Sequence, residues 1–311
     1  MHWILLATFG QFLNAIVAIL DKYIVSDERI MPRPFVYAFY SCLVTGFWAV
    51  IYIFGLFPPL AALGMPSLSN VTFPSIQVVS MSFLTAYTFF LALVSMYDAL
   101  RQSDASTVIP IIGAVSALSS FGLSYVFLDA SLTSGHILGI ILLSIGTLLV
   151  AQTLPKINVI LHVFHSGLFF AFHYITIKGL FIETSFDNGF FWSRISFVLF
   201  ALSLLLVPAY LQKIKSQTKS SGKKAGILVL ANKTLAGVAA FLILKATDIG
   251  EVSVVQALDG LRFVFILLIA SVFAHWLPDS ATDKDTRPGT IFRRFLYVSL
   301  ILIGFLVTFA W

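Results

Sequence analysis

Apolar residues dominate ten stretches of the chain, and short polar or charged connections separate them. Each stretch has about 18–27 residues, which is enough for a helix to cross a hydrocarbon core of about 30 Å. Because backbone groups find no hydrogen-bond partner in lipid, we expect each stretch to be α-helical. The pattern predicts membrane-spanning helices at residues 3–22, 34–57, 76–99, 104–127, 134–151, 158–179, 190–210, 225–246, 251–277 and 292–311.

The two halves of this pattern repeat each other. Lys22 and Lys178 close the first segment of each half. Aligning Ala99 with Ala246 also pairs Asp104 with Glu251, Ser106 with Ser253, Val108 with Val255 and Gly113 with Gly260. Because five spans per half is an odd number, the second half must cross the bilayer in the opposite sense. We therefore predict an all-α membrane protein whose ten transmembrane helices form two inverted five-helix repeats, over residues 1–154 and 155–311.

Composition agrees with a membrane protein. The chain is 59% hydrophobic and 11% charged, with a mean hydropathy of +0.97, whereas a soluble domain has about 25% charged residues. The net charge of +5 does not indicate nucleic-acid binding, because the basic residues lie in connections between segments. Cys42 is the single cysteine, so no intrachain disulfide can form. We expect the first segment to be retained as a helix, because it lacks a small-residue cleavage site.

The basic residues also predict an orientation. Lysine and arginine gather at odd-numbered connections, above all in the loop 212–224 with its five lysines. By the positive-inside rule this places both termini outside the cytoplasm.

Several polar residues fall deep within the predicted helices, where an ionisable group is costly unless it faces a cavity or a partner. Lys233 and Arg262 are the deepest cations, and Gln256, Asp259 and Arg262 share one helix face. One interpretation is an Asp259–Arg262 pair that only locks helix packing, and the other is a polar cavity. The candidate substrate-binding residues are Asn14, His165, His173, Asn232, Lys233, Gln256, Asp259 and Arg262.

The sixth segment carries His162, His165 and His173 on one face, with Ser166 nearby. No cysteine or second acidic ligand stands at matching spacing, so the sequence argues against a zinc site. A water-lined histidine face or a proton relay fits better. We interpret Arg194 as an anchor that snorkels to the interface, and Tyr37 as a packing residue. Pro110 is expected to bend its helix.

Residues 19–23, 104–113, 232–233 and 252–258 carry a resemblance that extends over essentially the whole chain. With the ten-segment plan, they make the sequence similar to the EamA-type branch of the drug/metabolite transporter superfamily. The resemblance implies amino acids and related metabolites as substrates, and both termini in the cytoplasm, against the charge pattern. Family members usually carry a glutamate between the fourth and fifth helices, where this chain has Asp129.

The sequence thus favours a secondary transporter, an exporter or exchanger of small polar metabolites such as amino acids or related organic anions, by alternating access at a midplane site. We expect it in the plasma (cytoplasmic) membrane, without a cofactor, bound metal or enzymatic activity; an oligomer is compatible with the pattern. Proton coupling, exchange and facilitated diffusion stay open. The alternatives are a non-transporting membrane subunit or lipid-handling membrane protein, and an intramembrane enzyme that uses the histidines of the sixth segment.

Overall fold

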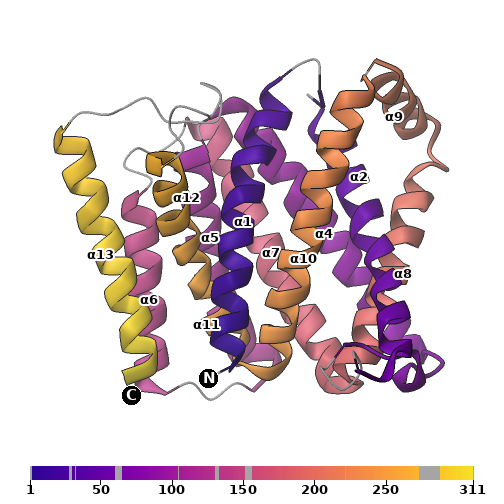
Figure 1. The fold of residues 1–311 in the computed structure, drawn as a ribbon, viewed down its shortest axis with the longest axis horizontal. Coiled ribbons are helices and arrows are strands. Elements are labelled where there is room, and N and C mark those ends of the chain that lie inside the picture. Colours follow the sequence, from indigo (N-terminus) through magenta and orange to yellow (C-terminus); the bar gives the residue numbers. More distant parts are fainter. Residues whose placement is uncertain are drawn as a thin grey trace.

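The computed structural model describes residues 2–27, 30–31, 33–59, 65–103, 105–129, 133–150, 156–220, 222–272 and 288–310. All regular elements in these ranges are helical, and most run roughly side by side in one bundle (Figure 1). Several of the helices are long and apolar, as in an integral membrane protein. The prediction of an all-α membrane protein is therefore confirmed. Asp104, Arg29, Lys284 and Arg287, which entered the repeat and charge arguments, lie outside the described residues.

Over its described residues, each predicted segment coincides with a helix or with a broken helix, and residues 104, 151, 273–277 and 311 of these segments lie outside the described ranges. The first half contains α1 (His2–Ser26), α2 (Pro34–Phe47) continued by η1 (Trp48–Leu56), the short turn η2 (Leu68–Asn70), α4 (Ile76–Gln102), α5 (Ala105–Phe127) and α6 (Ser134–Val150). The second half contains α7 (Ile157–Glu183), α8 (Phe186–Leu204), α9 (Pro208–Ser220), α10 (Lys223–Ile249), α11 (Val252–Ala257), η3 (Leu258–Gly260), α12 (Leu261–Val272) and α13 (Pro288–Ala310).

Six of these helical stretches are long and apolar enough to cross a membrane, or seven if the bent pair α8 and α9 forms one span. Two shorter apolar helices, α6 and residues Leu296–Val307 within α13, fall below that length.

Two stretches differ in detail from the expected helices and loops. The predicted helix 251–277 is interrupted by η3, a 3-10 turn that contains Asp259. Such a turn within a helix often marks a strained or functional point. The basic loop 212–224 is instead helical through Ser220, as α9. By contrast, α5 runs unbroken through Pro110.

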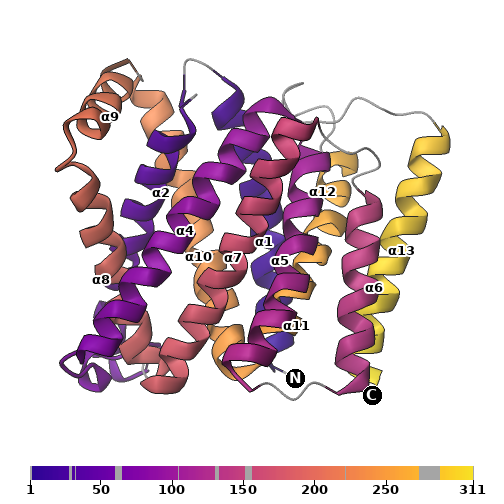
Figure 2. The same ribbon diagram turned by 180° about the vertical axis from the view of Figure 1, so that it is seen from behind.

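Helices that are distant in the sequence pair in a pattern that links the two halves. α1 packs against α10, α4 against α7, α2 against α8 and α6 against α13. α6 and α13 form one edge of the bundle and α2 and α8 the other (Figures 1 and 2). α1 begins at the same end of the bundle at which α13 finishes (Figure 1).

Close helix approach depends on small residues. At Gly10 in α1, a Cβ atom would lie 2.7 Å from Ile243 Cγ1 of α10. At Gly237 in α10, a Cβ would overlap the indole of Trp48. Small residues at such crossings let helices in a membrane gain contact area without a water-driven hydrophobic term.

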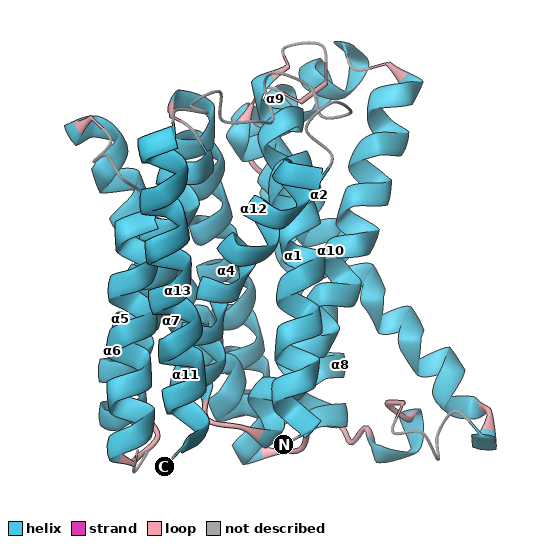
Figure 3. Cartoon of the chain, turned by 60° about the vertical axis from the view of Figure 1, so that its left-hand side comes forward, coloured by secondary structure: helices cyan, strands magenta, loops and turns pink. Residues whose placement is uncertain are grey.

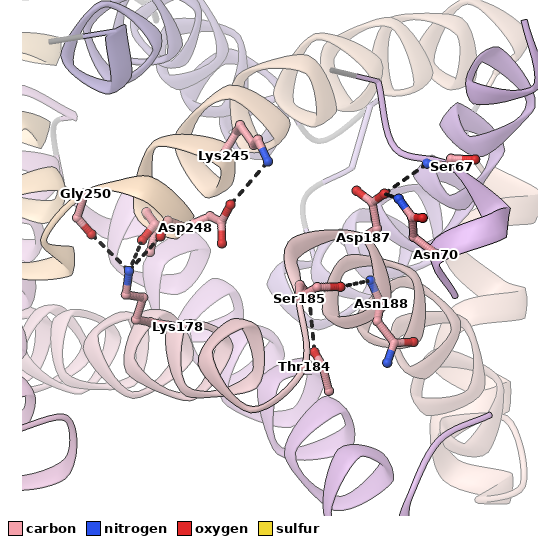
Figure 4. A network of polar contacts seen from close by, with 11 residues as sticks. Ser67, Asn70, Lys178, Thr184, Ser185, Asp187, Asn188, Lys245, Asp248 and Gly250 are labelled. Atoms are coloured by element: carbon pink, nitrogen blue, oxygen red, sulfur yellow. Dashed lines mark hydrogen bonds and ion pairs between the residues drawn. The ribbon is translucent and has the colours of Figure 1, made fainter. Parts of the chain in front are cut away.

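A lysine near the end of the first helix of each half closes another helix of that half. Lys22 Nζ donates hydrogen bonds to the carbonyl oxygens of Leu100 and Ser103 at the end of α4, at 2.8 and 2.9 Å. Lys178 Nζ donates to the carbonyl oxygens of Thr247, Asp248 and Gly250 at the end of α10 (Figure 4). A cation at a helix C-terminus satisfies unpaired carbonyls and complements the helix dipole.

The segment before α4 is tied to the start of α8. Asp187 accepts hydrogen bonds from Asn70 Nδ2 at 2.7 Å and from the Ser67 backbone N–H at 3.2 Å (Figure 4). Asn188 Nδ2 donates to Thr72 Oγ1 at 3.0 Å. These bonds close the bundle at the end opposite α9.

Candidate functional site

A buried ion pair joins α1 and α10. Lys233 Nζ lies 2.7 Å from Asp21 Oδ1, and both side chains are about 5–6% exposed. Asn232 Nδ2, from the neighbouring position of α10, donates to the same Asp21 oxygen at 2.7 Å. The sequence predicted Asn232 and Lys233 as site residues, and the structure brings them together on one carboxylate.

Two tyrosines complete this cluster. Tyr37 of α2 donates a hydrogen bond to Asp21, and Lys233 Nζ donates to Tyr97 OH of α4 at 2.8 Å. The ammonium also lies 4.2 Å from the centre of the Tyr37 ring and 5.1 Å from that of Tyr97. Four helices therefore meet at one charge pair, which we call the Asp21 cluster: Asp21, Tyr37, Tyr97, Asn232 and Lys233.

A cavity of about 120 Å³ lies against this cluster. Asp21, Tyr97 and Lys233 of the cluster line it, and Arg262 contributes a third charged side chain. The remaining lining is mixed, with the polar residues Asn14, Ser41 and Thr45 and the apolar or aromatic residues Val17, Ala18, Phe89, Leu93, Met96, Leu100, Ile109, Phe170, Tyr174, Ala236 and Ala240. α1, α2, α4, α5, α7, α10 and α12 all contribute, so the cavity lies between the two halves.

Arg262 pairs with Asp259, three residues earlier on the same broken helix. Asp259 lies in the turn η3, where a Cβ placed on Gly113 of α5 would lie 2.7 Å from Asp259 Oδ2. Gly113 thus meets Asp259 side-chain atoms, while Gly260 faces Thr147 instead. Arg262 Nε has no hydrogen-bond partner in the described structure. This guanidinium therefore keeps an unused donor beside a cavity.

Gln256 and Asn14 occupy polar positions close to these groups. Gln256 is buried and accepts a hydrogen bond from Ser116 of α5 at 3.4 Å. Asn14 lines the cavity and donates to Gln11 at 3.4 Å. Asn14 can therefore turn a polar group toward a bound molecule, whereas the side chain of Gln256, from α11, is held by Ser116 of α5.

The histidines of α7 contact α4 instead of lining this cavity. His165 Nδ1 lies 2.6 Å from Ser95 Oγ, and His173 Nδ1 lies 3.0 Å from the Thr85 carbonyl oxygen. His173 is buried between aromatic rings, with Phe89 at 4.9 Å. The structure therefore separates both predicted residues from the Asp21 cluster. Among the described residues, no group of three or more histidine, cysteine or acidic side chains could hold a metal ion.

Arg194 corrects an expectation. It was interpreted as a snorkelling anchor, but it is 2% exposed and its guanidinium lies between the rings of Phe190 and Phe197, at 4.6 and 4.7 Å. Arg194 Nε and Nη2 each donate a long hydrogen bond of 3.4 Å to Ser193 Oγ. In the described part of the chain, no carboxylate forms an ion pair with it. The helix face that carries Arg194 turns inward, so the side chain cannot reach the interface.

Sequence reasoning missed two partners in the site, Tyr37 and Tyr97, because they resemble many other aromatic residues of an apolar chain. Asp21 belongs to a polar stripe with Gln11 and Asn14, which recur along the same helix at helical spacing. The sequence leaves open whether such a stripe holds two helices together or lines a cavity. In the structure Lys22 bonds to α4, and Asp21 faces inward to Lys233.

Comparisons with known proteins bear on the fold of the chain. No protein-family model matches the chain, and no curated protein does. Among solved structures, one described only as "Crystal structure of protein" is similar to it, with a TM-score of 0.64 and 15% sequence identity. The match covers 100% of this chain and 99% of that one. At 15% identity this similarity shows a shared fold along the whole chain and gives no information about activity.

Proposed function

We propose that this chain is a secondary transporter in which two inverted five-helix repeats carry a small polar metabolite through the central cavity. The observation that carries the proposal is a cavity between the two halves whose lining includes Asp21, Lys233 and Arg262. Ionisable groups at membrane depth are costly, and where they line a cavity they commonly mark a substrate pathway. Secondary transporters with inverted repeats place their sites at this position.

The helix pairings support the inverted repeat. In the repeat, α1, α2, α4, α5 and α6 correspond to α7, α8, α10, the broken helix α11–α12 and α13. Exchanging each helix with its counterpart turns the α1–α10 contact into α7–α4 and the α5–α7 contact into α12–α1. The same exchange turns the α4–α8 contact into α10–α2. All of these contacts occur, and α2–α8, α6–α13 and α5–α11 map onto themselves. Lys22 and Lys178 follow the same exchange, since each closes the third helix of its half. They do so at opposite ends of the bundle, as inversion requires.

The charge balance favours an anionic substrate. In the described helices Lys233 and Arg194 are buried and Arg262 is partly buried, but only Asp21 and Asp259 form ion pairs with these three cations. The interior therefore carries one positive charge in excess, and a carboxylate or phosphate group would neutralise it. Amino acids and related organic anions, which the resemblance to the EamA-type branch implies, fit this requirement. The plasma membrane stays the proposed location.

Counterflow in proteoliposomes tests the proposal. A thermal-shift screen of the purified protein against a metabolite panel first selects a candidate, which is then loaded into vesicles. We expect accumulation by the wild type, strong loss in Arg262→Gln, and normal accumulation in Arg101→Gln, whose exposed side chain lies at a helix end. If no panel member is stabilising or accumulates, a non-transporting membrane subunit or a lipid-handling protein becomes the better interpretation.

A further inference from the structure

α9 lies outside the helix bundle. It bends away from α8 by 97° and extends across one end of the molecule (Figure 1). α8 already has 19 residues, about 28 Å at 1.5 Å per residue, so it approaches the thickness of a hydrocarbon core by itself. The polar helix α9, which lies at one end of the molecule (Figure 3), is therefore not required by length to complete a span.

One face of α9 is fixed to the protein. Ile214 and Gln217 are buried, and the ring of Tyr210 lies 4.8 Å from that of Phe35. Arg33 Nη1 donates a hydrogen bond to Ser216 Oγ at 2.8 Å. These contacts with α2 and the residue before it hold α9 in one orientation.

The parts of α9 outside this fixed face carry exposed lysines. Lys213 and Lys215 are exposed on α9, and Lys223 and Lys224 are exposed where α10 begins. Within the described ranges, no carboxylate pairs with any of these four lysines. Lys215 also borders an open groove whose other walls include Pro208 and Leu211. The groove therefore offers apolar surface directly beside a cation.

We propose that α9 and the start of α10 form a docking surface for the headgroups of anionic phospholipids. An amphipathic helix with lysines on its polar face lies in the membrane interface and is attracted by anionic lipids. Lys213, Lys215, Lys223 and Lys224 supply the charge, and the groove beside Lys215 supplies contact for the upper part of an acyl chain. This surface is distinct from the central cavity and does not depend on transport.

Native mass spectrometry of the full chain in non-ionic detergent tests this surface. We compare the titration of phosphatidylglycerol with that of phosphatidylcholine, which has the same backbone and no net charge. We expect the wild type to bind phosphatidylglycerol more tightly, and the variant Lys213→Gln/Lys215→Gln to lose on the order of tenfold in that affinity. Binding of phosphatidylcholine should be unchanged.

The matched control is Arg101→Gln/Arg293→Gln, which removes two exposed cations at the same end of the bundle but outside α9. We expect this variant to keep the preference for phosphatidylglycerol. Equal losses in both double variants would overturn the proposal, because they would reflect overall charge alone. Full displacement of the lipid by millimolar inorganic phosphate would also overturn it, since the site would then recognise a free anion.

Discussion

Two ion pairs in the interior of the described structure, one buried and one partly buried, differ in how they are built. Asp21–Lys233 joins two helices of opposite halves, and Asn232, Tyr37 and Tyr97 bond to the same charges. Asp259–Arg262 lies within one broken helix, is somewhat more exposed, and leaves Arg262 Nε without a partner. In the first pair Asp21 Oδ1 accepts three hydrogen bonds, from Tyr37, Asn232 and Lys233, whereas in the second pair Arg262 retains an unused donor at the cavity.

This difference assigns the two pairs different tasks. The Asp21–Lys233 pair joins α1 and α10 and so helps to hold the two halves together. A conformational change around the cavity must either keep this ion pair or break it. A pair within a single helix places no constraint on a neighbouring helix, so Arg262 can turn from Asp259 toward a substrate anion without separating α12 from the bundle. We therefore expect the Asp21 cluster to dominate stability and Arg262 to dominate binding.

The largest expected effect is the loss of Lys233. Lys233→Met leaves Asp21 buried without its cation, which costs about 3–5 kcal/mol when one partner of a buried pair is removed. Thermal unfolding in detergent, followed by size-exclusion chromatography, measures the loss. The double variant Asp21→Asn/Lys233→Met removes both charges and should recover most of the stability. If the double variant is as unstable as the single one, the charges are not the cause and the packing of the lysine stem is.

Arg262→Gln is expected to cost less stability and more binding. Asp259 loses its partner but is less enclosed than Asp21 and borders a cavity, so we expect about 1–3 kcal/mol, the usual range for an unsatisfied buried polar group. The companion change Asp259→Asn/Arg262→Gln should restore the stability. Ligand-induced thermal shifts and counterflow should stay lost in that double variant. A stable and fully active double variant would reduce the pair to a packing device and place the site elsewhere.

The same contrast explains what could be predicted from sequence. Helix positions follow from apolar length, because a bilayer requires a minimum number of residues per span, and all ten ranges coincide with helical stretches. Lys233 and Arg262 were found because a deep cation stands out in an apolar segment. Which partner each one chooses depends on helix rotation and tilt, so the sequence marked Asp21 only as part of a polar stripe with Gln11 and Asn14 and could not assign its partner.

Arg194 and the histidines illustrate the same limit from the other side. Arg194 lies on α8 and the histidines lie on α7, and these two helices pack against α4 and against each other. This packing determines which face of each helix turns inward, and the residue pattern of a single helix does not. His165 and His173 share a face of α7 as the spacing predicts, but that face meets Ser95 and Thr85 of α4 and not the cavity. Periodicity identifies a common face, and tertiary packing decides what the face contacts.

Tyr97→Phe sharpens the comparison within the Asp21 cluster. It removes the hydroxyl that accepts from Lys233 but keeps the ring and the ion pair with Asp21. We expect a loss of about 1 kcal/mol, the typical net value of one hydrogen bond. Tyr87→Phe, an exposed hydroxyl on the same helix α4, is the control and should have no measurable effect in the same thermal-unfolding assay. A loss as large as that of Lys233→Met would mean that Tyr97, and not Asp21, is the main partner of the ammonium.

The smallest expected effects compare the two halves through Lys22 and Lys178. Each ammonium satisfies carbonyl oxygens at the end of α4 or α10, so Lys22→Met and Lys178→Met should each cost about 1 kcal/mol or less, as for a cation at a helix C-terminus. Hydrogen–deuterium exchange at residues 96–103 and 243–250 localises the change. If the halves are inverted copies, Lys22→Met should loosen the end of α4 at one face of the membrane, and Lys178→Met the end of α10 at the other. Arginine in place of either lysine should restore protection, because it keeps the charge and the donors. Loosening of the same helix end by both substitutions, or of neither, would contradict the equivalence of the two lysines and with it the repeat on which the transport proposal rests.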